Sequence, residues 1–115
     1  MTAIDDKASQ LPWIGAPVDA GAGSGEMDLG DGRGHARDYE NASIYWTPQT
    51  GAFEIHGAIR DMWQSMGWER SWLGYPTSDE RDMPGGRVSL FQGGKIEWTP
   101  SGGPHATRMG PIDDG

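Results

Sequence analysis

The sequence predicts an α+β protein built from two tandem repeats of about 50 residues, each a short β-hairpin or meander joined to one helix. Three observations support this fold class: a block of motifs that occurs twice, a Gly-Gly turn between two β-rich runs, and one apolar stripe at helical spacing. The length of 115 residues fits one small domain. Nineteen glycines and eight prolines indicate dense turns, and six tryptophans indicate a packed core.

The repeat is visible as matching motifs in the same order. Trp13-Ile14-Gly15-Ala16-Pro17 aligns with Trp72-Leu73-Gly74-Tyr75-Pro76, and Ile44-Tyr45-Trp46-Thr47-Pro48 aligns with Ile96-Glu97-Trp98-Thr99-Pro100. The offset between the copies falls from 59 residues at the first block to 52 at the second. The first copy therefore holds extra residues, and we place them in a flexible glycine- and acid-rich loop at 20–31.

Two hairpins are expected, one in each copy. In the second copy, the runs 87–92 and 95–98 flank two glycines, which readily supply the positive φ of a tight turn. The first copy should form its hairpin over 36–46, with the turn at 40–42. Residues 52–56 are expected to return as a third strand.

A helix is expected between the hairpins, over residues 57–66. The apolar side chains that fall on one face at helical spacing are Ile55, Ile59, Met62, Trp63 and Met66. Gly67 follows where a left-handed C-terminal cap is favoured.

The predicted organisation has four parts. Residues 1–10 are an acidic, disordered N-terminus, residues 11–69 form the first repeat, residues 70–110 form a partial second repeat, and residues 111–115 are a disordered tail. The formal net charge is -8, but residues 32–110 hold nine acids against eight bases, so the acidity belongs to the ends of the chain. An acidic balance argues against nucleic acid as a partner.

Composition also excludes several kinds of site and segment. The chain has no cysteine, which removes disulfides, thiol catalysis and cysteine metal sites. No apolar run approaches the roughly 18 residues that suggest a transmembrane helix. The first twenty residues show no basic region followed by an apolar one, so no secretory signal is expected.

On these motifs the chain resembles an LGFP-repeat protein. Leu73-Gly74-Tyr75-Pro76 matches the signature, and Ile14-Gly15-Ala16-Pro17 is a degenerate copy, within a resemblance that covers about residues 11–110. The resemblance implies a non-catalytic module that stacks its units in a propeller-like array and attaches to wall polysaccharide, of arabinogalactan or peptidoglycan type, at the actinobacterial envelope. An envelope or extracellular location is implied in this way, whereas the missing signal leaves a cytoplasmic or phage-borne protein open.

The aromatic residues divide into a predicted core and a predicted platform. Four tryptophans occupy equivalent positions in the two copies and a fifth lies on the apolar stripe of the helix, so core packing is expected for Trp13, Trp46, Trp63, Trp72 and Trp98.

Three other rings are the predicted ligand-binding residues. Trp68 has no counterpart and lies just past the helix, so an exposed ring is expected. Tyr75 sits in a turn where its counterpart is Ala16, and Tyr45 faces the side of its strand opposite to Trp46. Sugar rings present C–H faces that stack on aromatic rings, so Trp68, Tyr75 and Tyr45 form the candidate platform.

No catalytic residue, metal site or cofactor is predicted. His56 at the helix start is expected to bond backbone groups, and His35 and His105 receive no assignment. The acids Asp79, Glu80 and Asp82 are expected to form a solvated turn, with a weak calcium site as the alternative. The serines Ser71, Ser78 and Ser89 lack a nucleophile-elbow context, and residues 21–34 lack the strand and helix of a phosphate-binding loop.

Three functions therefore remain open from the sequence. The first is a binding module for wall polysaccharide. The second is a structural or assembly protein whose repeats self-associate or bind a partner chain, since two units leave sheet edges exposed. The third is an accessory or inhibitor of a neighbouring enzyme.

Overall fold

The computed structural model describes residues 3–18, 27–28 and 34–108, the pair 27–28 by its backbone alone. Within these residues the element order is α1 (Ala3–Ser9), the short 3-10 helix η1 (Pro12–Ile14), β1 (Met27–Asp28), β2 (His35–Asp38), β3 (Ser43–Thr47), β4 (Gly51–Ile55), α2 (Gly57–Met66), the 3-10 helix η2 (Trp68–Arg70), β5 (Arg81–Met83), β6 (Gly86–Phe91), β7 (Gly94–Thr99) and β8 (Gly103–Arg108). Neither α-helix has the length and apolar composition that crossing a membrane requires.

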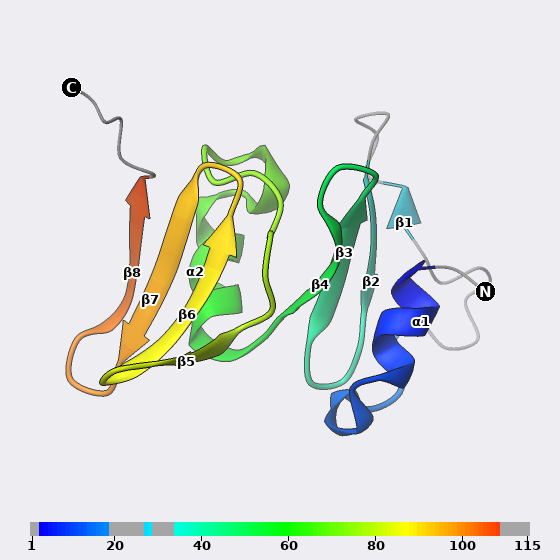
Figure 1. Ribbon diagram of the computed structural model, residues 1–115, viewed down its shortest axis with the longest axis horizontal. Coiled ribbons are helices and arrows are strands. Elements are labelled where there is room, and N and C mark those ends of the chain that lie inside the picture. Colours follow the sequence, from blue (N-terminus) through cyan, green and yellow to red (C-terminus); the bar gives the residue numbers. More distant parts are fainter. Residues whose placement is uncertain (1–2, 19–26, 29–33, 109–115) are drawn as a thin grey trace.

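The strands form two antiparallel meanders of the same design (Figure 1). One sheet has the order β1-β2-β3-β4 and the other β5-β6-β7-β8. The register is also the same, because Trp46 pairs with His35 and Ala52 as Trp98 pairs with Arg87 and Pro104. The tandem repeat and the α+β class predicted from the motifs are therefore confirmed.

Each sheet is preceded by a helix that packs on it. α1 packs on β3 and β4 of the first sheet, and α2 packs on β7 and β8 of the second. α1 runs downward and α2 upward in Figure 1, so consecutive units point in opposite directions. Each structural unit is thus a helix, a turn and four strands, and α2, which the sequence placed inside the first repeat at 11–69, packs as the helix of the second unit.

The N-terminal helix corrects one expectation. Residues 1–10 were predicted to be disordered, but residues 3–9 form α1, and Ile4 is 1% exposed against the first sheet. An ion pair also joins the helix to the first sheet, because Arg37 of β2 lies 3.4 Å from the carboxylate of Asp5. Most of the loop predicted at 20–31, and the tail 111–115, lie outside the described residues.

The segments predicted from local signals are confirmed. α2 spans Gly57–Met66, and Gly67 caps it at φ 115° with its N–H bonded to the carbonyl groups of Trp63 and Gln64. The hairpin of the second copy is β6 and β7, and that of the first copy is β2 and β3. The third strand predicted at 52–56 is β4.

The turn that gives the repeat its signature is built identically in both units. Gly15 and Gly74 have φ values of 82° and 73°. In the first unit the Ala16 N–H donates to Glu40 Oε1 at 2.9 Å, and in the second the Tyr75 N–H donates to Gln92 Oε1 at 3.1 Å. A Cβ at either glycine would lie within 2.7 Å of that same oxygen, which makes glycine the residue that fits.

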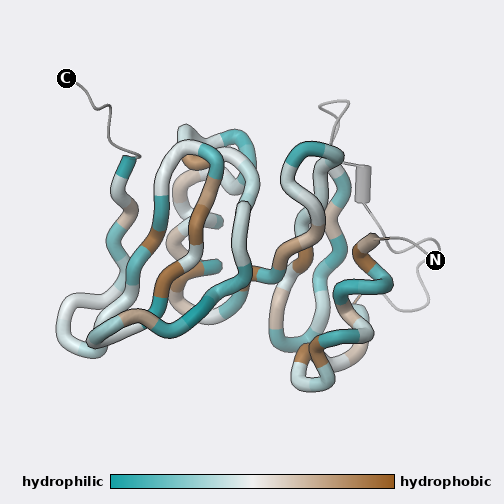
Figure 2. The backbone as a smooth tube through the Cα atoms, viewed as in Figure 1, coloured by the Kyte–Doolittle hydropathy of each residue, from teal (hydrophilic) through white to brown (hydrophobic). Residues whose placement is uncertain are grey.

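The described residues form two hydrophobic clusters. The smaller lies between α1 and the first sheet and contains Ile4, Ile14, Tyr39, Ala42 and Ile44. The larger surrounds α2 and takes residues from both sheets: Ala36, Tyr45 and Ile55 from the first, and Phe91 and Ile96 from the second. Figure 2 shows strong apolar colour on β6, whereas β7 alternates between apolar and polar residues. The first sheet is therefore covered on both faces, whereas the second receives a helix on one.

We predict that Gly74→Ala lowers the free energy of unfolding by about 2–3 kcal/mol. Left-handed backbone costs a side-chain-bearing residue about 1–2 kcal/mol, and displacing Gln92 removes a hydrogen bond worth about 1 kcal/mol. Urea unfolding followed by tryptophan fluorescence measures this loss.

Gly85→Ala is the matched control for that measurement. Gly85 has φ 82°, but a Cβ there would meet nothing within 4 Å, so only the backbone strain is expected. Equal losses at the two positions would show that the contact of Gly74 with Gln92 contributes nothing.

Candidate functional site

A cavity of about 490 Å³ opens where the start of α2 meets the second sheet. Its lining residues come from three parts of the chain and are His56, Ala58, Ile59, Glu80, Arg87 and Trp98. One wall is apolar and carries an indole ring, and the rest offers imidazole, carboxylate and guanidinium groups. This is the combination of shape and chemistry found in sites for small polar ligands.

The fold positions these groups through strand register and helix placement. Arg87 and Trp98 pair across β6 and β7, so their side chains lie on the same face of the sheet, the one covered by α2. His56 is the extended residue between β4 and α2, at φ -151°. His56, which connects the first unit to the second, thus lines the same cavity as Arg87 and Trp98 of the second sheet.

The buried carboxylate of Glu54 holds the connection between β4 and α2 in place. Glu54 is 2% exposed, and its Oε2 accepts from the Glu80 N–H at 2.9 Å. In return the Glu54 N–H donates to Asp79 Oδ1 at 3.0 Å. Lys7 of α1 reaches the other oxygen of Asp79 at 2.5 Å, so one reciprocal contact joins both units and the first helix.

His56 lies between two carboxylates. Its Nδ1 is 2.6 Å from Glu54 Oε1, and its Nε2 is 3.4 Å from Glu80 Oε2. The hydrogen bond to Glu54 raises the pKa of His56 above its ordinary value of 6.5, although burial acts in the opposite direction. The predicted role of His56 in bonding backbone groups is wrong for its side chain, because its ring bonds carboxylates and no side-chain cap is formed.

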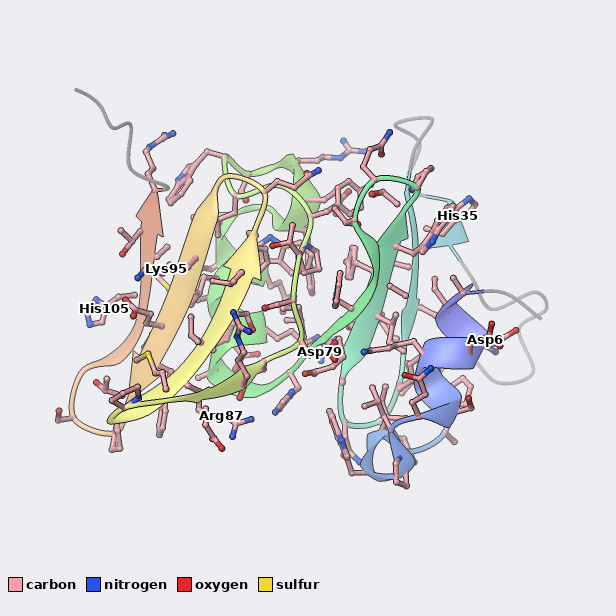
Figure 3. All side chains as sticks on the ribbon, in the orientation of Figure 1. Asp6, His35, Asp79, Arg87, Lys95 and His105 are labelled. Carbon is pink, nitrogen blue, oxygen red and sulfur yellow. The ribbon has the colours of Figure 1, made fainter. Side chains whose placement is uncertain are left out.

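Arg87 completes the row of charges at the cavity wall. Its Nε donates to Glu80 Oε2 at 3.0 Å, and its NH1 donates to the exposed carboxylate of Asp82. Figure 3 shows Arg87 at the foot of the second sheet and Asp79 between the two sheets. Alternating cations and anions leave the wall almost neutral while its nitrogen and oxygen atoms stay able to bond hydroxyl groups.

The acidic run 79–82 is therefore more than the solvated turn expected from the sequence. Asp79 and Glu80 join the two units, whereas Asp82, with its side chain 86% exposed, lies at the surface beside Arg87. Among residues 3–18, 27–28 and 34–108, no three metal-ligating side chains come together as a metal site.

The three residues predicted as a ligand platform lie around the larger core. Tyr45 and Tyr75 are 4% and 0% exposed, so both rings are enclosed by the core. The Tyr75 hydroxyl fits against Gly34, where a Cβ would lie 1.9 Å from it. Burial also raises the pKa of the Tyr45 hydroxyl.

Trp68 is only partly buried but is also packed. Its ring stacks on Tyr45 at 6.0 Å between centroids, and Arg60 lies 5.9 Å from it. Its φ of 59° is costly for a bulky side chain, and the stacking offsets that cost. The binding role of Trp68, Tyr75 and Tyr45 stays a prediction, but none of the three offers the open ring face on which it was based.

The open rings belong to two other tryptophans. Trp13 is 43% and Trp72 is 37% exposed, so the core packing predicted for them is wrong. Trp63 at 0% exposure is in the core as predicted, and Trp46 and Trp98 are partly buried against the clusters. The centroid of the Trp13 ring lies 4.9 Å from that of His56, which places an exposed indole beside the cavity.

Comparison with known families agrees with the duplicated architecture. The LGFP repeat model matches residues 21–71 and again residues 73–114. The chain belongs to the LGFP repeat family. No curated protein matches it. LGFP repeats are non-catalytic modules of the cell-envelope type.

The sequence did not indicate that these residues line one cavity in this pair of LGFP repeats. Glu80 was expected in a solvated acidic turn, Trp98 was expected in the core, and Arg87 was given no role in a site. One signal was available: His35 pairs with Trp46 as Arg87 pairs with Trp98, so a planar, nitrogen-rich side chain recurs beside the same tryptophan. The contact of His56 with Glu80 could not be predicted from the sequence, because it depends on how one unit packs against the next.

We predict a pH-dependent contribution of His56 to stability. The pKa of His56 is raised in the folded protein, so its contribution is fully present below about pH 6.5, the unfolded value. The contribution is lost as the pH rises through the folded pKa. The difference in unfolding free energy between the wild type and His56→Asn should therefore shrink with rising pH, as measured by urea unfolding across this range.

His105→Asn serves as the control, because His105 is exposed on the outer strand β8. The difference between this variant and the wild type should stay constant over the same range. A His56→Asn difference that grows with pH would contradict the assignment of the imidazolium to the Glu54 contact.

Proposed function

We propose that this pair of LGFP repeats is a non-catalytic binding module for cell-wall polysaccharide of arabinogalactan or peptidoglycan type. The cavity at the start of α2 carries the proposal, because it combines the ring of Trp98 with the polar groups of His56, Glu80 and Arg87. A sugar ring needs an apolar surface for its C–H face and hydrogen-bonding groups for its hydroxyls. Both lie within this one cavity.

The charges of the cavity support a neutral ligand. Arg87 is held by Glu80 and Asp82, and His56 by Glu54 and Glu80, so neither cation is free to neutralise an anionic group. A phosphate-rich ligand would also meet the carboxylates of the wall. A neutral hydroxylated polymer can bond these groups without separating the ion pairs.

The proposed setting is the actinobacterial cell envelope, outside the membrane. The support is membership of a family of envelope-type repeats, together with a cavity suited to hydroxyl groups. The glycan strands of the wall are the hydroxylated and repetitive polymers that such a setting supplies.

We further propose that longer arrays of such units stack in a propeller-like manner, with each new helix packing on the open face of the preceding sheet. In this chain that open face of the second sheet is polar: Glu97 stands where the first sheet has Tyr45, and Lys95 pairs with Glu97 at 3.5 Å. Figure 3 shows His105 pointing away from the rest of the molecule on the same side. Polar outer faces are typical of terminal repeats. The alternative function in assembly is thus less well supported on this face.

We predict that Trp98→Ala weakens retention on insoluble arabinogalactan or peptidoglycan by about tenfold, equivalent to about 1.4 kcal/mol of binding free energy. The reason is loss of the stacking surface in the cavity. Sedimentation of the purified protein with each polymer, over a range of polymer concentrations, measures the effect.

Two further variants make the result specific. Arg87→Gln keeps the indole but removes the guanidinium and should also weaken retention. Glu97→Gln alters the neighbouring residue of β7, whose side chain lies on the opposite face, and should bind as the wild type does. Failure of the wild type to sediment with either polymer would end the proposal, provided that its circular dichroism shows a folded protein.

A further inference from the structure

The two most exposed tryptophans occupy the same position in successive repeats. Trp13 precedes Gly15 of the first signature turn, and Trp72 precedes Gly74 of the second, 59 residues later. They are 43% and 37% exposed, although large aromatic rings are normally drawn into a core. Single exposed apolar residues need no explanation, but a ring that stays exposed at one position in both copies does.

The neighbour of each exposed ring is also equivalent. His56 directly follows the last strand of the first sheet, and Arg108 ends the last strand of the second. The Trp13 and His56 rings are 4.9 Å apart, and the Arg108 guanidinium carbon lies 4.5 Å from the Trp72 ring centroid. In both repeats a planar nitrogen-rich group therefore fixes the orientation of the indole, which leaves a rigid ring surface open to solvent.

The two segments that carry these rings lie at opposite edges of the protein. The η1 segment that carries Trp13 is at the lower edge in Figure 1, and the turn that follows η2, where Trp72 lies, is at the upper edge. This opposition follows from the reversed direction of the two units. A straight polymer strand lying along one edge cannot contact both rings.

We propose that Trp13, beside the cavity, and Trp72, on the opposite edge, are two equivalent stacking positions for a neutral sugar polymer. One protein molecule would then link two polysaccharide strands. This inference rests on the proposed function, because it takes the same class of ligand. It adds a second binding position, at Trp72 and Arg108, that the cavity does not include. Two positions on one rigid body make the protein a cross-linker rather than a single-strand anchor.

The contacts at the second position suit a sugar. Trp72 is 37% exposed, and the Arg108 guanidinium over its ring supplies N–H donors for hydroxyl groups. A flexible apolar side chain would adapt its shape to many ligands, whereas an indole held by a cation presents a flat surface that fits the C–H face of a sugar.

Cross-linking is tested by titrating soluble arabinogalactan with the wild-type protein and following light scattering. A two-position protein should give a maximum in scattering at intermediate ratios and a decline when protein is in excess. Trp72→Ala should abolish that maximum while its retention on insoluble arabinogalactan stays within about threefold of the wild type, because the position beside Trp13 is intact.

Matched variants separate stacking from other effects. Trp72→Tyr keeps an aromatic face and should restore most of the scattering. Val18→Ala alters another exposed apolar side chain, which is 60% exposed, and should leave the titration unchanged. The mass of the protein alone, from size-exclusion chromatography with light scattering, should be that of one chain for the wild type and for Trp72→Ala.

The possible outcomes separate the second stacking position from the proposed function. A wild type that is retained on the polymer but shows no scattering maximum would overturn the second position and leave the proposed function standing. A wild type that is not retained at all would refute the proposed function itself. A dimer that Trp72→Ala converts to a monomer would assign Trp72 to contacts between copies of this chain and overturn the sugar-stacking role.

Discussion

The structure depends on the burial of Trp63 between two sheets. Its ring is 0% exposed and meets Tyr45 of the first sheet at 4.6 Å and Phe91 of the second at 5.3 Å, between centroids. Burying a ring of this size contributes more to stability than any ion pair at the surface. Because α2 carries Trp63, the helix that begins the second unit also covers the first, and the two repeats share one core.

The shared core places the polar groups of the junction. Once α2 is seated between the sheets, its first turn lies beside the end of β4 and the start of β5, and Glu54 must enter a nearly solvent-free position. Its reciprocal bonds to residues 79–80 and its contact with His56 satisfy that carboxylate. The cavity lies next to this junction, so the packing of apolar groups indirectly determines which polar groups face a ligand.

The sequence predicted what depends on neighbours along the chain. The helix over 57–66 and its Gly67 cap follow from apolar spacing and backbone preference, and the hairpins follow from their turns. α1 was missed because Ile4 is its only fully buried side chain, although the repeat offset of 59 aligns Ile4 with Trp63. The burial of Tyr45 was missed because period-two alternation shows which side of a strand a residue faces, but not whether a helix will cover that side.

Equivalent positions in the two repeats share their exposure to solvent as well as their residue type. Residues at equivalent positions have similar surroundings. Trp13 and Trp72 are both partly exposed to solvent, and each lies beside a nitrogen-rich side chain, His56 or Arg108. The same symmetry that suggested a core therefore identifies a surface feature. The residues of the cavity, from His56 to Trp98, come together through the reversal of one unit against the next, which no local pattern encodes.

The most direct measurement is an NMR titration of the six indole N–H signals with soluble fragments of arabinogalactan. If the open and cavity-lining rings bind sugar, the signals of Trp13, Trp72 and Trp98 should shift in a saturable way. The signal of Trp63, which is enclosed in the core, should stay in place. Saturable shifts at Trp63 and Trp68 alone, or no shift at any of the six, would contradict the account.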